Sequence, residues 1–134
     1  MKRMLFKRAN NNRGALSADH IYLEARSRWA KVVSLSIYDN EDMLYSVVRL
    51  LEKARRQNGQ HVQSLVLLSD LFMQLGADRE AMPIVESLLT LQPQNQTHVQ
   101  KKALLQQLQV NRTDRSLNAV REFIEARWTQ TNDW

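Results

Sequence analysis

From residue 17 onward, apolar side chains recur every three or four residues, which is the spacing of one face of an α-helix. Short polar or helix-breaking positions divide this pattern into six segments, and the breaks lie at Tyr38–Asn40, Asn58–Gly59, Gly76, Pro93 and Asn111–Asp114. The chain holds only three Gly and two Pro, too few for the many tight turns of an all-β fold. The sequence therefore predicts one all-α domain over residues 15–134.

Side chains that accept a backbone N–H are expected where these helices begin. They are Ser17 for the first helix, Asp39 or Asn40 for the second, Asp78 for the fourth, and Thr97, in a capping box with Gln100, for the fifth. We expect Gly59 to end the second helix in the left-handed conformation. Pro83 lacks the N–H that a helix interior needs, so either the first turn of the fourth helix is distorted or that helix begins later.

The helices recur at a regular interval along the chain. The third and fifth segments begin about 35 residues apart, and the second, fourth and sixth begin about 37 and 36 apart. A helix pair that repeats at this period is typical of a solenoid of stacked helical hairpins. We therefore predict three stacked antiparallel helix pairs.

Residues 62–95 carry small, large and helix-stopping residues in a fixed order. The positions are Leu65, Leu68, Ser69, Phe72, Gly76, Ala81, Val85, Leu88 and Pro93. In this register the segment resembles one tetratricopeptide (TPR) repeat, in which small residues stand where the two helices cross closely. The other two pairs are TPR-like by length and period only, since Lys102 stands where the third repeat should carry a large apolar residue.

The resemblance implies a concave groove lined by the first helix of each pair. The groove positions it implies are Gln63, Val66, Leu67, Asp70, Met73 and Gln74, with Lys101 adding positive charge at one end. The alternative is that Val66 and Leu67 bury a neighbouring pair. An exposed groove of this composition would suit an amphipathic helix or an extended apolar segment. Asp70 would repel a carboxylate, so an acidic peptide would fit poorly.

The size of the chain and the run VESLLTLQPQN are similar to small bacterial TPR chaperones, including those of type III secretion. The resemblance implies a non-enzymatic chaperone or adaptor in the cytoplasm that binds a helix or extended peptide of another protein. Trp128 and Trp134, near the end of the last helix, also predict self-association.

Motifs for catalysis are missing from the sequence. It has no Gly-rich phosphate loop, no nucleophile elbow and no His-Glu-x-x-His pair. There is no Cys, and His20, His61 and His98 are too far apart for a local metal motif. We therefore expect no enzymatic activity, cofactor or metal. No apolar run approaches the roughly 20 residues of a membrane span, and Met4–Phe6 is too short for a signal peptide.

The positive charge of the chain is concentrated at its start. The net charge is +5, and the first 14 residues contain five bases and no acid: Lys2, Arg3, Lys7, Arg8 and Arg13. We expect residues 1–14 to be a disordered basic tail. The alternative is a tether to nucleic acid or to an anionic membrane, with the basic residues of segment 26–56 assisting. That alternative would make the chain a nucleic-acid-associated or regulatory protein.

Overall fold

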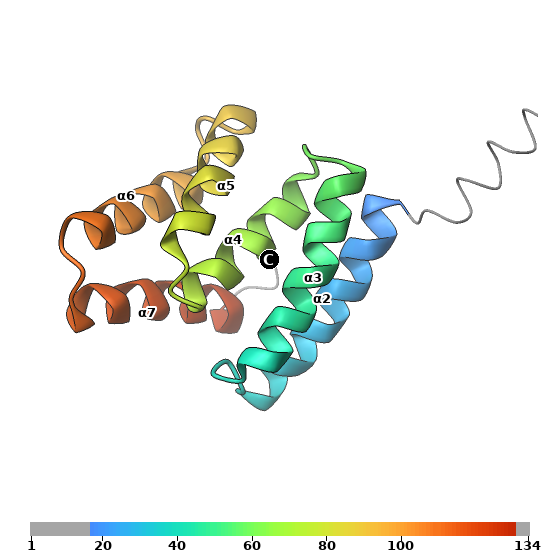
Figure 1. The fold of residues 1–134 in the computed structure, drawn as a ribbon, viewed down its shortest axis with the longest axis horizontal. Coiled ribbons are helices and arrows are strands. Elements are labelled where there is room, and N and C mark those ends of the chain that lie inside the picture. The colour runs from blue at the N-terminus through green and yellow to red at the C-terminus, as the bar shows by residue number, and fades with distance from the viewer. Residues whose placement is uncertain (1–16, 131–134) are drawn as a thin grey trace, which may run out of the picture.

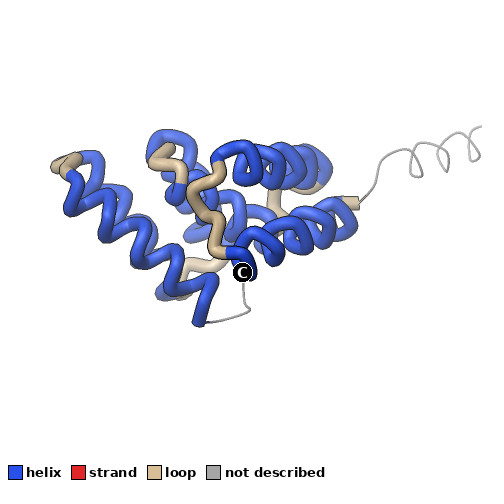
Figure 2. Tube along the Cα trace, turned by 90° about the horizontal axis from the view of Figure 1, so that it is seen from below, coloured by secondary structure: helices blue, strands red, loops and turns tan. Residues whose placement is uncertain are grey.

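The computed structural model describes residues 17–130 as six helices joined by short turns (Figure 1). The helices are α2 (Ala18–Leu35), α3 (Glu41–Gln57), α4 (Val62–Gln74), α5 (Asp78–Leu91), α6 (Gln96–Val110) and α7 (Asp114–Gln130). This part of the chain contains no strand, as Figure 2 also shows. The predicted all-α class and the six helical segments are confirmed. None of these helices is long and apolar enough to cross a membrane.

Two helices begin as the sequence predicts. The Ser17 side chain accepts the backbone N–H of His20 at the start of α2, and Asn40 accepts that of Met43 at the start of α3. Each side chain satisfies an N–H that the first helical turn leaves without a partner.

Other helix ends differ from the sequence prediction. The cap of α6 is Asn95, whose Oδ1 accepts the N–H groups of Thr97 and His98, so the capping box predicted at Thr97 is wrong. The residue before α5 is Ala77, which makes no side-chain cap. Asp78 is the first residue of α5, so its prediction as the cap is wrong, and because the helix contains Pro83 the alternative of a later start is wrong too.

The left-handed backbone positions also fall elsewhere than expected. Gly76 has a φ of 74°, and Ser36 at the end of α2 has a φ of 54°. Gly59 has no positive φ, because α3 ends in the extended backbone of Asn58 instead.

Consecutive helices pack as pairs, and the closest pairs are α2 with α3 and α4 with α5 (Figure 1). The last pair, α6 with α7, does not simply continue a regular stack. α6 packs on α5, whereas α7 turns back and packs against α4. In three equivalent stacked hairpins, the first helix of the last pair, α6, would pack against α4. Here the second helix of that pair, α7, packs against α4 instead.

The larger of two hydrophobic clusters in the described residues joins all six helices, and α4 lies at its centre. α4 packs against α3, α5 and α7, so nine of its residues are buried. The fully buried core includes Trp29, Leu51, Leu68, Val85 and Ile124 from five different helices. The central position of α4 explains why its sequence is the most apolar of the six helices.

An aromatic cluster joins the end of α7 to the first helix pair. The ring of Trp128 meets Trp29 edge-on at a centroid distance of 4.6 Å and lies 5.4 Å from Tyr38. Edge-to-face contacts of this kind add to the stabilisation from the buried area. The last helix is thus tied to the first.

Candidate interaction groove

A hollow of about 620 Å³ lies between α2, α4, the start of α6 and the end of α7. We call it the groove, and its lining is Tyr22, Leu23, Arg26, Val62, Gln63, Val66, Gln92, Asn95, Thr97, His98 and Arg127. It opens over the first helices of the three pairs, which is the face that the TPR resemblance singles out. α7 enters its lining only through Arg127.

The two walls of the groove differ in chemistry. α2 and α4 supply the aliphatic wall, in which Leu23, Val62 and Val66 lie beside the polar Arg26 and Gln63, and Leu23 is 58% exposed. The opposite wall is the polar start of α6 with the turn that precedes it. Such a surface offers apolar contact on one side and hydrogen-bonding groups on the other.

Hydrogen bonds fix the polar wall. Asn95 caps α6, and the ring Nε2 of His98 lies 2.8 Å from Oε1 of Gln92. Because the Gln92 oxygen only accepts, His98 Nε2 must carry the proton in this bond. The bond holds the turn between α5 and α6 against the first turn of α6.

His98 is uncharged at neutral pH. Burial, together with the positive charges of Lys101 and Arg127, lowers its pKa to about 4, and the carboxylate of Asp70 opposes this change. With Nε2 donating to Gln92, the buried Nδ1 carries a lone pair and has no partner within residues 17–130. His98 is 2% exposed although it lies in the first turn of α6.

A buried ion cluster lies beneath the groove. The side chains of Asp70 and Lys101 are both fully buried and form a direct ion pair. Lys101 Nζ also donates to Ser69 Oγ at 2.9 Å and to the backbone oxygen of Val66 at 3.3 Å. Arg127 donates to the second oxygen of Asp70 from α7 at 3.3 Å. Burial lowers the pKa of Lys101, and the carboxylate of Asp70 opposes that change.

The structure separates the residues predicted to line one groove. Gln63 and Val66 line the groove. The predicted exposure is wrong for four others, which are buried: Leu67, Asp70, Met73 and Lys101. The physical reason is the central position of α4, whose remaining faces are covered by α3, α5 and α7. For Leu67 the alternative of burial against a neighbouring pair holds.

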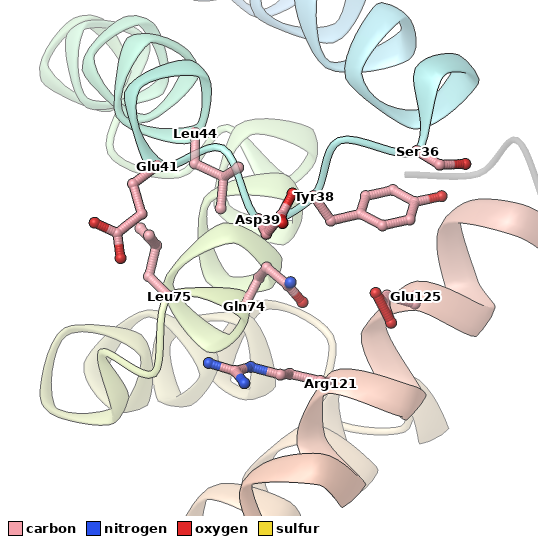
Figure 3. A pocket seen from close by; sticks show the side chains of 9 residues that line it. All are labelled: Ser36, Tyr38, Asp39, Glu41, Leu44, Gln74, Leu75, Arg121 and Glu125. Carbon is pink, nitrogen blue, oxygen red and sulfur yellow. The ribbon is translucent and has the colours of Figure 1, made fainter.

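Gln74 lies at a different hollow, of about 500 Å³, between the turn after α2, the end of α4 and α7 (Figure 3). Gln74 is 8% exposed, and its Oε1 has no partner within residues 17–130. The charged side chains at this hollow are Asp39, Glu41, Arg121 and Glu125. The predicted grouping of Gln74 with Gln63 is therefore wrong, since the two lie at separate hollows.

Of the residues that line the groove, the sequence predicts only Gln63 and Val66 and misses the others, Arg26, His98 and Arg127 among them. A signal for Arg127 does exist in the sequence. Asp70 interrupts the apolar run of α4, and a buried carboxylate requires a cation from another segment.

The basic tail residues Lys2, Arg3, Lys7, Arg8 and Arg13 lie outside the described residues. Trp134 does too. Within residues 17–130, no three His, Asp or Glu side chains gather as metal ligands would. His61 instead bonds Asp19 at 2.6 Å.

Comparison with protein-family models, curated protein sequences and solved structures gives no match.

Proposed function

We propose that this chain is a non-enzymatic protein-interaction module, a chaperone or adaptor whose groove holds a segment of another polypeptide. The observation that carries the proposal is the groove itself, a hollow of about 620 Å³ lined by aliphatic side chains of α2 and α4 and by polar groups at the start of α6. Peptide-binding surfaces combine such walls, because apolar side chains of the ligand need burial while its backbone needs hydrogen-bonding groups.

The sequence supports the same proposal. The TPR-like order of residues in segment 62–95 implies a peptide-binding concave face, and the groove lies over α2, α4 and α6. A chaperone in a bacterial secretion system would be one setting for this activity, as the resemblance to small bacterial TPR chaperones implies.

A random dodecapeptide library displayed on phage tests the proposal without a known partner. We expect the purified protein to select binding peptides, and Leu23→Glu to abolish their binding because it places a charge on the aliphatic wall. Leu35→Glu is the matched control, since Leu35 lies on the same helix, is 67% exposed and does not line the groove.

Circular dichroism should show the same helix content in both variants, because both residues are exposed. The proposal fails if no peptide is selected, or if the selected peptides bind the Leu23→Glu variant as well as the parent.

A further inference from the structure

The charged side chains that line the groove have one sign. Within the described residues, Arg26 of α2 and Arg127 of α7 contribute positive charge, and no carboxylate lines the groove. Asp70 lies beneath it, but Lys101 and Arg127 already pair with this carboxylate. The expected repulsion of acidic ligands by Asp70 is therefore absent from the groove surface.

The start of α6 adds to the positive potential of the groove. The first turn of α6, with Thr97 and His98, lies in the lining, and a helix start carries partial positive charge. The pKa of His98, which burial lowers most, is lowered also by the positive charges of Lys101 and Arg127. Arg127 is 15% exposed, so its charge is only partly screened by water.

We infer that the segment held in the groove is acidic. One or more Asp or Glu side chains of the partner face Arg26 and Arg127, while an adjacent apolar side chain packs on Leu23 and Val66. This inference rests on the proposed function and names the chemistry of the partner. Carboxylates match the guanidinium geometry and form charge-assisted hydrogen bonds with it.

A nucleic acid is the other common polyanion, but the groove fits it less well. Proteins that bind single strands present exposed aromatic rings on which bases stack. The aromatic residue of the groove, Tyr22, is 4% exposed, and the exposed wall is aliphatic instead. An aliphatic wall matches the side chains of a peptide.

The test uses synthetic, fluorescently labelled copies of the peptides that the phage library yields. Each peptide is compared with a copy in which every Asp and Glu is replaced by Asn and Gln, by fluorescence anisotropy against the full chain. We expect the neutral copies to bind about tenfold more weakly or worse. Arg26→Gln should weaken the acidic peptide by a similar factor, and Arg26→Lys should retain more affinity.

Arg49→Gln is the matched control, because Arg49 is an exposed arginine on α3 that does not line the groove. It should leave the affinity unchanged. A labelled 20-nucleotide single-stranded DNA is titrated in parallel.

The outcomes separate the inference from the proposed function. If peptides bind through Leu23 but their neutral copies bind equally well, the acidic partner is excluded and the interaction module stands. If no peptide is selected, both fail. If only the DNA binds and Arg26→Gln weakens it, the groove is a nucleic-acid site and both peptide proposals are overturned.

Discussion

Asp70 and Lys101 are the most tightly constrained charges in the molecule, because neither side chain is exposed to water. The attraction within such a pair mainly offsets the cost of removing both ions from water. The pair therefore adds little net stability, but losing one partner leaves an uncompensated charge in the core. The cluster also determines which helices meet, since its members come from α4, α6 and α7.

Replacing Asp70 tests this account. We expect Asp70→Asn to lower the free energy of unfolding by about 3–5 kcal/mol, because Lys101 would remain buried without its counter-charge. The double variant Asp70→Asn with Lys101→Met should recover part of this loss. Urea unfolding followed by circular dichroism measures both. A double variant no more stable than the single one would contradict the account.

His98 makes stability depend on pH. Its pKa is about 4 in the folded chain, against an ordinary value of 6.5. Between pH 6.5 and 4, His98 therefore binds a proton in the unfolded chain but not in the folded chain. Stability should fall as the pH drops through this range, by at most about 1.4 kcal/mol per pH unit.

Unfolding free energies measured at several pH values between 4 and 7 check this prediction. The variant His98→Gln should show a flatter profile over the same range. A parent and variant with parallel profiles would show that His98 is not responsible.

At the scale of whole helices, α7 is the element whose position was hardest to predict. The apolar stripe in its sequence predicts the helix and the face that is buried, which carries Val120, Ile124 and Trp128. The stripe does not say what it packs against, because helical periodicity is local and the partner helix lies elsewhere in the chain. In the structure that partner is α4, together with the aromatic residues Trp29 and Tyr38.

Trp128→Ala should therefore destabilise the whole fold. We expect a loss of about 3–5 kcal/mol, because the change leaves a cavity against Trp29 at the junction of α7 and α2. Val110→Ala is the control at an 88% exposed position and should change stability by less than about 0.5 kcal/mol. Urea unfolding measures both, and a loss below about 1 kcal/mol for Trp128→Ala would contradict this packing.

Unlike Trp128, which stabilises the fold, Pro83 destabilises the helix in which it lies. It is exposed inside the helix, where it removes the N–H that would bond the carbonyl of Arg79. We expect Pro83→Ala to stabilise the chain by about 1–3 kcal/mol, the gain being reduced by the greater freedom of the unfolded chain. A lower melting temperature in the variant would show that the proline is needed at this position.

At the scale of the whole molecule, α7 gives the helix array a closed arrangement. In an open stack each pair contacts only its neighbours, and the terminal pair opens most easily. Here α7 contacts α4 and reaches Trp29 of α2. The last helix is therefore stabilised by helices from all three pairs.

Native-state hydrogen exchange tests this closure. We expect amides in the middle of α7, near Ile124, to open with nearly the same free energy as those in the middle of α4. Exchange of α7 at a much lower free energy than α4 would instead show a last pair that opens independently, as in a regular repeat array.

The sequence predicts the helices well and their neighbours only in part. Ser17 and the apolar spacings act within one or two turns, so they can be read locally. The positions of Leu67 and Met73 depend on whether another helix covers them, and the repeat pattern suggested that none does. A charged residue within an apolar helix face does indicate which other helices pack there, because it cannot be buried without a counter-charge. Asp70 is the example, since its burial requires Lys101 of α6 and Arg127 of α7.

Arg127 belongs to two environments at once, because it lines the groove and also holds the carboxylate of Asp70. A guest carboxylate that attracts this guanidinium competes with Asp70 for it. Occupancy of the groove and attachment of α7 are therefore thermodynamically linked, and each alters the other by the same factor. If the groove holds an acidic segment as proposed, Arg127 is the side chain through which binding would affect the packing of α7.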